Sequence, residues 1–246
     1  RIYPQQQLRR LQRIRRLLDQ GMRPGKVVTL SDSELDILES ELYQQDAVDA
    51  AIEDIITVLQ TTDASKLEAM LTGIYRQQGM QAFITATVSP LLHTIGKRWA
   101  TGRLQIFEEH LLSQVLNRVL NREISVLQQD AGKPRVLLAT LPGEEHTLGL
   151  LMVSALLSSR QVAVVNLGAE VPLSQVVAAV ERFQVDVVGV TFSGAYQYEN
   201  IRSDLIELRQ SIAEKIDIWT GGEGVRRLRK LPPGVTKIMS LDKLPL

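Results

Sequence analysis

Residues 135–167 read RVLLATLPGEEHTLGLLMVSALLSSRQVAVVNL, and this stretch decides the fold. It predicts a strand at Arg135–Leu141, a polar loop, a helix at Leu148–Leu157 and a second strand at Val162–Leu167. A short apolar run bounded by turn residues is typical of a strand buried on both faces. Strand, helix and strand in this order predict a βαβ unit with parallel strands.

The same alternation continues toward the C-terminus. Helices are expected at Pro172–Phe183 and Ile201–Ile212, and strands at Asp186–Phe192 and Ile216–Thr220. Residues 133–246 are therefore expected to form a Rossmann-like (flavodoxin-like) domain with a doubly wound parallel sheet. Ligands of such sheets bind beyond the carboxyl ends of the strands, so the loops that follow the strands are the candidate functional segments.

Upstream of this domain the apolar residues recur at helical rather than strand spacing. This pattern predicts a four-helix bundle over residues 31–132. The expected helices and their bounds are Ser31–Tyr43, Asp46–Leu59, Asp63–Ile74, Met80–Trp99 and Leu104–Gln129. The fold class is thus α plus α/β, a helical bundle followed by a parallel sheet.

Charge is distributed unevenly although the 28 basic and 28 acidic side chains balance. Residues 1–26 carry a net charge of +7 and the rest of the chain carries −7. The basic part includes a helix expected at Pro4–Gln20, with leucines on one face and arginines on the other. A basic segment on an acidic body suggests a polyanionic partner, and a solvated helix face is the alternative.

Several classes of protein are excluded by composition. The chain has no cysteine, which rules out disulfide scaffolds, Cys-ligated zinc, iron–sulfur clusters and thiol catalysis. No apolar run approaches the roughly 20 residues that a membrane helix needs. The N-terminal residues lack the apolar core of a secretory signal. We expect a soluble, cytoplasmic protein with no membrane partner.

The loop after the first strand carries Glu144, His146 and Gly149. A histidine at this edge of a parallel sheet can face a ligand, and Glu144 could accept a hydrogen bond from one ring nitrogen, leaving the other free for a metal. One histidine without cysteines cannot make a structural zinc site, so a metal would arrive inside a cofactor that brings its own ligands. In the alternative interpretation the acids favour the dipole of the next helix and His146 is a passive surface residue.

Glu144-x-His146-x-x-Gly149 resembles the Asp-x-His-x-x-Gly signature of cobalamin-binding domains. The resemblance implies that His146 is the lower axial ligand of cobalt, in place of the dimethylbenzimidazole base, and that the displaced nucleotide tail enters the sheet edge. One departure is Glu144, where the family has aspartate.

Two further elements of that family have counterparts here. Ser193 follows the strand that ends in GVTF, and Gly221-Gly222 follow the strand IDIWT. The resemblance implies that these three residues line the groove for the nucleotide tail. Gly194 and Ala195 depart from the family, which usually has leucine or threonine two residues after the serine.

Trp99 precedes Glu109-His110 by nine intervening residues. The three side chains could converge on one pocket, or Trp99 could belong to the bundle core and the other two to a solvated face. The spacing resembles the Trp-x-nine-Glu-His motif of light-sensing, adenosylcobalamin-dependent regulators of the MerR class (the CarH/LitR type). The resemblance implies that Trp99 packs on the adenosyl group and Glu109 bonds its ribose. After light breaks the cobalt–carbon bond, His110 would ligate cobalt from above.

The N-terminal residues are similar to the wing end and last helices of a MerR-type winged-helix domain. Arg1-Ile2-Tyr3 and LRRLQRIRRLLDQGMRPGKV (residues 8–27) carry this resemblance, which implies a remnant of that domain at residues 1–30. The recognition helix would lie outside this sequence. Arg9, Arg13 and Arg16 are the candidate DNA contacts.

The resemblance implies a light-sensing repressor and not an enzyme, so no catalytic residue is expected. It implies adenosylcobalamin between the bundle and the sheet domain, with methylcobalamin as the other form, and operator DNA and further copies of the chain (a dimer or tetramer) as partners. Two alternatives stay open. One is a corrinoid methyl carrier of a methyltransferase system. The other is a MerR-class regulator that senses another tetrapyrrole or no cofactor.

Overall fold

The computed structural model describes residues 5–19, 22–128 and 132–245 of the chain. The chain divides into two compact units, Arg1–Asp54 and Ile55–Leu246. The helical and α/β parts beyond residue 55 thus form one compact unit, whereas the three-domain division at residues 30 and 132 stays a prediction. No helix within the described ranges combines the length and apolar character needed to cross a bilayer.

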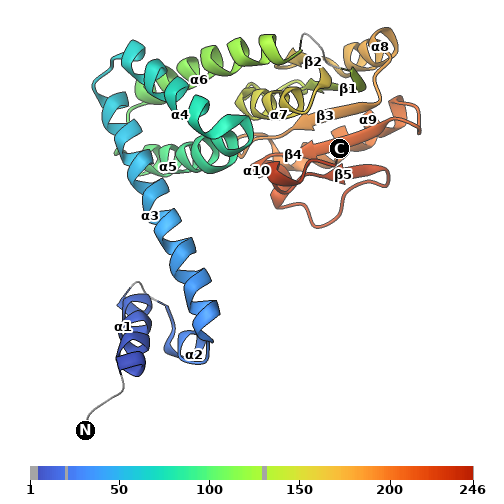
Figure 1. The fold of residues 1–246 in the computed structure, drawn as a ribbon. Coiled ribbons are helices and arrows are strands. Elements are labelled where there is room, and N and C mark those ends of the chain that lie inside the picture. Colours follow the sequence, from blue (N-terminus) through green and yellow to red (C-terminus); the bar gives the residue numbers. More distant parts are fainter. Residues whose placement is uncertain (1–4, 20–21, 129–131, 246) are drawn as a thin grey trace. The chain divides into compact units, whose positions relative to one another are not determined.

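Helices dominate the first half of the chain and alternate with strands in the second (Figure 1). The elements are α1 (Gln5–Asp19), α2 (Pro24–Val27), α3 (Asp32–Gln60), α4 (Ala64–Ala82), the π-helix η1 (Phe83–Val88), α5 (Ser89–Ala100), α6 (Ile106–Leu127), β1 (Gly132–Ala139), α7 (Leu148–Ser159), β2 (Val162–Gly168), α8 (Leu173–Phe183), β3 (Val187–Thr191), α9 (Tyr198–Ser211), β4 (Asp217–Gly221), α10 (Glu223–Arg226), β5 (Val235–Lys237) and the 3-10 turn η3 (Leu241–Lys243).

The N-terminal unit has a small core of its own. Ile14 and Leu17 of α1 pack with Val27 of α2 and Leu35 of α3, and all four side chains are buried. The basic helix expected at Pro4–Gln20 is therefore present as α1, with its apolar stripe turned onto α3. Such a stripe stabilises a helix through tertiary packing, because isolated helices of this length are marginal in water.

The helices expected at Ser31–Tyr43 and Asp46–Leu59 are a single helix, α3, so the predicted break near residue 44 is wrong. The intervening Gln44, Gln45 and Asp46 are polar but tolerated in a helix. Neither glycine nor proline occurs between residues 32 and 60, and these are the residues that end helices most effectively.

Residues 64–127 supply the helical part of the second unit. Asp63 caps α4 by accepting a hydrogen bond from the backbone N–H of Lys66 at 2.9 Å. Gly79 interrupts the helix with φ of +74°, a left-handed conformation that glycine adopts at no steric cost. After this kink the chain passes through η1 into α5. The single helix expected at Met80–Trp99 therefore contains a π-helical segment.

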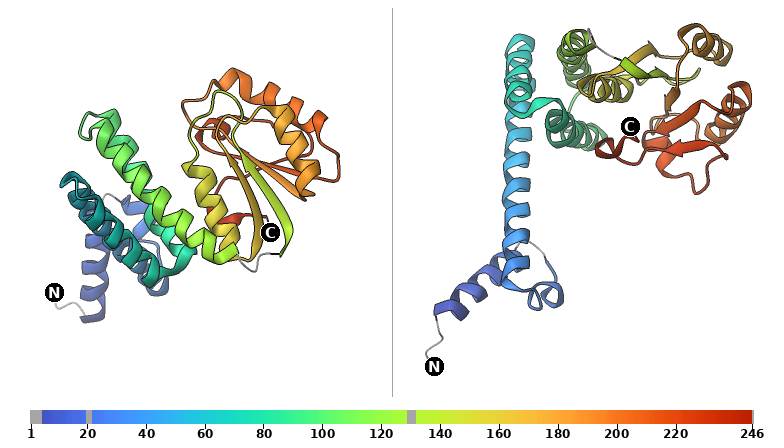
Figure 2. Two further views of the ribbon diagram at one scale, coloured as in Figure 1. Left: turned by 90° about the horizontal axis from the view of Figure 1, so that it is seen from above. Right: turned by 45° about the vertical axis from the view of Figure 1, so that its right-hand side comes forward.

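The sheet has the strand order β2-β1-β3-β4-β5, and every described pairing is parallel (Figure 2). This is the flavodoxin-like order, which reverses direction between β1 and β3 and leaves a crevice there. The four expected strands are found within a few residues of their predicted bounds. The short strand β5 was missed because three residues after Pro232-Pro233-Gly234 give no periodic signal.

Both faces of the sheet are covered by helices. Alternate residues such as Leu137 and Val188 point into a core shared with Val176 of α8 and Leu205 of α9. The opposite face, which includes Leu138, is covered by α7. Helices α4 and α6 pack against the outer side of α7, so the helical part lies over the same sheet face as α7 (Figure 1).

Candidate functional site

The loop between β1 and α7 holds a histidine against a buried carboxylate. Oε1 of Glu144 lies 2.7 Å from Nδ1 of His146 and accepts a hydrogen bond from the His146 backbone N–H at 2.9 Å. The Glu144 side chain is 1% exposed and that of His146 is 64% exposed. Glutamate thus reaches the imidazole despite its extra methylene. The contact fixes the ring through Nδ1, leaving Nε2 available to a ligand.

Glu144 also reaches the loop after β3. Its second oxygen, Oε2, accepts a hydrogen bond from the backbone N–H of Ser193 at 2.5 Å. Burial alone would raise the pKa of Glu144, but the hydrogen bonds from Ser193 and His146 outweigh burial and hold the pKa below its ordinary value. The carboxylate is therefore ionised at neutral pH, and its charge strengthens the hydrogen bond from the imidazole.

Close backbone contacts join the turn after β3 to the turn after β4. The N–H of Phe192 donates to the Gly221 carbonyl, and the N–H of Gly224 donates to the Phe192 carbonyl. Gly222 has φ of +94°, and a Cβ there would lie 2.3 Å from the Phe192 carbonyl oxygen. Only glycine can occupy position 222, because any Cβ would clash with the Phe192 carbonyl. Gly224 has the same restriction, because its Cβ would lie 2.7 Å from the Ser193 carbonyl oxygen.

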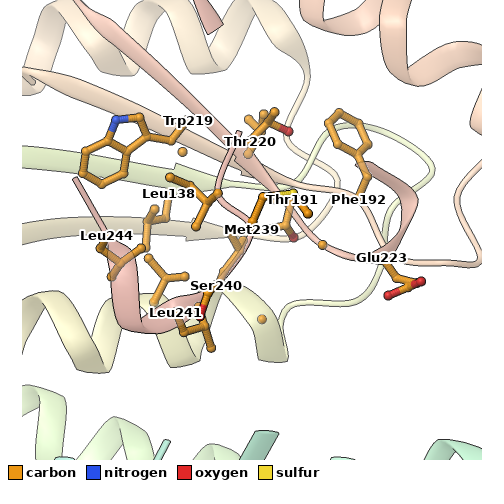
Figure 3. A pocket seen from close by; sticks show the side chains of 18 of the residues that line it. Leu138, Thr191, Phe192, Trp219, Thr220, Glu223, Met239, Ser240, Leu241 and Leu244 are labelled. Atoms are coloured by element: carbon orange, nitrogen blue, oxygen red, sulfur yellow. The ribbon is translucent and has the colours of Figure 1, made fainter. Parts of the chain in front are cut away.

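A cavity of about 350 Å³ opens on the α7 face at the carboxyl ends of the strands. Leu138, Gly189 and Trp219 are successive partners across β1, β3 and β4, and all three line it. Gly189 leaves space between its larger neighbours, because a Cβ there would lie 2.6 Å from Cδ2 of Leu138. In Figure 3, Trp219 lies on one side of the cavity and Leu241 on the other.

The cavity includes the predicted residues of the sheet edge. His146, Gly149, Ser193, Gly221 and Gly222 all line it. An added Cβ at Gly149 would meet no atom within 4 Å, so the backbone at the start of α7 faces open space. The predicted lower-side residues are thus brought together, with Glu144 buried behind the imidazole.

The cavity wall also has a polar atom without a partner. The hydroxyl of Thr220 is buried and makes no hydrogen bond to any described residue. A buried hydroxyl without a partner costs free energy, so a polar ligand atom would satisfy it. An apolar slot with a few polar groups and an available imidazole nitrogen fits a ligand that has both apolar and polar parts.

Trp99, Glu109 and His110 lie at the junction of α5 and α6, and none of them lines the cavity. Trp99 is 54% exposed and the His110 side chain is 72% exposed. Glu109 contacts His110 Nδ1 at 3.2 Å and accepts a hydrogen bond from Ser113 at 2.7 Å. The alternative of Trp99 in the bundle core is therefore wrong.

Of the three candidate DNA contacts, only Arg13 has a described side chain. Its guanidinium pairs with Asp36 at 2.6 Å and with Glu39 at 2.9 Å, so this side chain is occupied inside the N-terminal unit. The side chains of Arg9 and Arg16, and the whole of residues 1–4, lie outside the described residues.

Two family models, both described as B12 binding domain, match residues 134–236 and 43–122. The first match covers nearly all of the sheet, the Glu144–His146 pair and most of the cavity wall, and the second covers most of the helical part. The chain is a B12-binding protein. Cobalamin is therefore its cofactor, and the histidine at the sheet edge lies inside the matched domain.

The chain is also similar to curated proteins over most of its length. It is 28% identical to the HTH-type transcriptional repressor CarH of Myxococcus xanthus, covering 92% of this chain and 78% of that protein. It is 23% identical to the HTH-type transcriptional repressor CarA of the same organism, covering 92% and 75%. A match to the methionine synthase of Mycobacterium tuberculosis is 26% identical but covers only 12% of that enzyme.

The fold is shared with a solved corrinoid protein. The monomethylamine corrinoid protein of Methanosarcina barkeri superposes with a TM-score of 0.61 at 11% identity, covering 78% of this chain and 94% of that one. At this identity the likeness shows the fold, a helical part followed by a parallel sheet.

Several cavity residues were not predicted from the sequence. Trp219 and Thr220 lie on β4, and Thr85 and Ser89 come from the helical part. Trp219 is one of two tryptophans and lies in an expected strand, which was an available signal. The segment from Ile238 to Leu244 had no such signal, because its position depends on β5.

Proposed function

We propose that the chain is a light-responsive, cobalamin-dependent transcriptional repressor of the MerR class, cytoplasmic and without catalytic activity. One observation carries the proposal. In a B12-binding chain, the buried Glu144 carboxylate orients the imidazole of His146 toward a cavity that suits a corrinoid tail. The similarity to two named repressors over 92% of the chain supports the regulatory role.

On the lower side, His146 would bind cobalt through Nε2 while Glu144 holds Nδ1. Ser193, Gly221 and Gly222 would line the groove that admits the nucleotide tail. Gly149 would allow the corrin edge to approach the start of α7. Outer partners of this kind fix the tautomer of a metal-binding histidine and raise its basicity.

On the upper side, Trp99 would pack on the adenosyl group and Glu109 would hold its ribose. When bound, adenosylcobalamin would supply a cobalt–carbon bond that light can break. His110 would then bind cobalt from above. The exposure of Trp99 supports this role, because a large exposed indole offers a surface for a planar ligand to cover.

The basic segment at residues 1–26 would contact operator DNA when the chain is assembled as a dimer or tetramer in the dark. Arg9 and Arg16 are the proposed phosphate contacts, and Arg13 could take part only by giving up its ion pairs with Asp36 and Glu39. Light would release the DNA if the two cofactor states favour different assemblies.

The test is to load the purified chain with adenosylcobalamin in darkness and record its absorption spectrum and its elution volume in size exclusion, before and after green light. We expect a spectral change and a smaller assembly after light. Binding to operator DNA would be measured in darkness and after light, and we expect light to weaken it. A bound cofactor with identical dark and lit assemblies would refute light control.

The second candidate function is that of a corrinoid methyl carrier, favoured by the fold of the monomethylamine corrinoid protein. A carrier loaded with methylcobalamin would pass the methyl group to a thiol acceptor in the presence of a methyltransferase. The repressor proposal instead expects no methyl transfer and a basic segment that binds DNA.

A further inference from the structure

We propose that Tyr196 is a positioning residue that clasps the histidine-bearing loop and thereby holds His146 in the orientation needed for cobalt. This inference rests on the proposed role of His146. Tyr196 lies in the loop after β3, whereas His146 lies in the loop after β1, so the clasp joins the two sides of the crevice.

The phenol group makes the first contact of the clasp. The Tyr196 hydroxyl lies 2.7 Å from Oδ2 of Asp204 on α9 and 3.3 Å from the Pro142 carbonyl oxygen. Its one proton points mainly to the nearer carboxylate, with the Pro142 carbonyl as a second acceptor. Helix α9 is thus linked through one side chain to Pro142, which lies in the turn between β1 and Glu144.

The ring makes the second contact. Its centroid lies 5.0 Å from that of Phe192, which lines the cavity and belongs to the sheet core. On the loop side, a Cβ at Gly143 would lie 3.5 Å from Cε2 of Tyr196, so the ring packs against the loop backbone. Gly143 has φ of +87°, and the next residue is Glu144.

The clasp therefore acts on the segment that carries the site. Tyr196 contacts Pro142 and Gly143 of this loop. Within the loop, the Thr140 hydroxyl donates a hydrogen bond to the Glu144 carbonyl. Burial and the Asp204 carboxylate raise the pKa of Tyr196 far above its usual range, so the hydroxyl keeps its proton and the link persists. A loop fixed at both ends loses less freedom when His146 binds a ligand.

The first test uses the corrinoid-free chain and the variant Tyr196→Phe, with Tyr198→Phe as the matched control. The Tyr198 hydroxyl contacts the Arg227 carbonyl at 3.3 Å and lies close in sequence. Both amides that donate to Glu144, those of His146 and Ser193, are followed by hydrogen exchange. We expect about fivefold faster exchange at His146 in Tyr196→Phe only, the factor for one net hydrogen bond.

The second test uses the cob(II)alamin complex and its electron paramagnetic resonance spectrum. The nitrogen splitting from His146 should weaken in Tyr196→Phe and in Asp204→Ala. It should persist in Asp204→Asn, which keeps an acceptor oxygen, and in Tyr198→Phe. Equal exchange and equal splitting in Tyr196→Phe and Tyr198→Phe would overturn the clasp. If even the unaltered chain shows no nitrogen splitting, the cobalt role of His146 fails, and the exchange experiment still decides whether Tyr196 holds the loop.

Discussion

The sheet edge and the α5–α6 junction each carry a histidine beside a glutamate, but the two pairs differ in how they are held. At the sheet edge, Glu144 is buried and bonds two elements, the loop of His146 and the start of the turn after β3. At the junction, the described partners of the Glu109 side chain are its neighbour His110 and Ser113, one turn further along the same helix.

We call the sheet edge the preorganised half, because hydrogen bonds hold its histidine in place before a ligand binds. We call the α5–α6 junction the conditional half, because its histidine lacks such support from other described elements. The orientation of His146 is set by hydrogen bonds within the chain, so a ligand pays little to order it. The His110 side chain is largely exposed, and its described contact is with Glu109, which belongs to the same helix. A cofactor that binds between such halves would meet a rigid lower side and an adaptable upper side, which suits a switch whose upper ligand changes.

The largest expected effect is at the preorganised half. His146→Ala should weaken cobalamin binding by about a hundredfold and convert the corrin absorption spectrum to the base-off form, because the only proposed protein ligand below cobalt is lost. Absorption titration with hydroxocobalamin measures both. His93→Ala is the control, since His93 is an exposed histidine of α5 that does not line the cavity. A His146→Ala spectrum like that of the unaltered chain would exclude His146 as ligand.

The next effect concerns the glycine turn behind the cavity. Gly222→Ala should cost about 2 kcal/mol in the free energy of unfolding, because the added Cβ meets the Phe192 carbonyl in a left-handed conformation. Urea denaturation measures the loss. Gly149→Ala should leave stability nearly unchanged but weaken cobalamin binding, since its Cβ enters open space in the cavity. Equal stability of the two variants would contradict this account of the turn.

The buried carboxylate predicts a pH dependence. Since the pKa of Glu144 is lowered in the folded chain, its charged form adds stability that is fully present above its ordinary pKa of about 4.3. That stability is lost as the pH falls through the lower folded pKa. Glu144→Gln should therefore cost about 1.5 kcal/mol at pH 7 and progressively less below pH ~4.

Urea denaturation of the cofactor-free chain at several pH values tests this expectation. The exposed neighbour offers a matched control, because Glu145→Gln removes the same charge without touching His146 or Ser193. A stability difference between Glu144→Gln and the unaltered chain that stays constant from pH 7 to pH 3 would show that the carboxylate is not the titrating group.

The sheet and its edge could be predicted from sequence because their signals are local. Each of the four expected strands is an apolar run bounded by turn residues, and Glu144, His146 and Gly149 follow the first one directly. Strands of a parallel sheet end at one edge, so side chains from three loops had to meet. The position of Ser193 next to Glu144 follows from this topology.

Other features depended on tertiary contacts that no local pattern carries. The Tyr196 clasp needs α9 to bring Asp204 beside the loop, and the lack of a described partner for the Thr220 hydroxyl depends on the packing around β4. The ion pairs of Arg13 were missed because charge counting treats arginines as solvated, whereas the acids of α3 lie opposite them. The continuous α3 was missed because the polar residues Gln44, Gln45 and Asp46 were interpreted as a break between two helices.

The smallest effect in darkness is expected at the conditional half. His110→Ala should leave binding of adenosylcobalamin in the dark unchanged within twofold, because the exposed imidazole makes no described contact beyond Glu109. After green light the same variant should release cobalamin about tenfold faster than the unaltered chain, since the proposed upper ligand is missing. Dialysis in the dark and after illumination, followed by the corrin absorbance, separates the two states. A variant that retains the photoproduct as well as the unaltered chain would remove His110 from the upper side, and Trp99 and Glu109 would then be the remaining residues of the junction through which light could act.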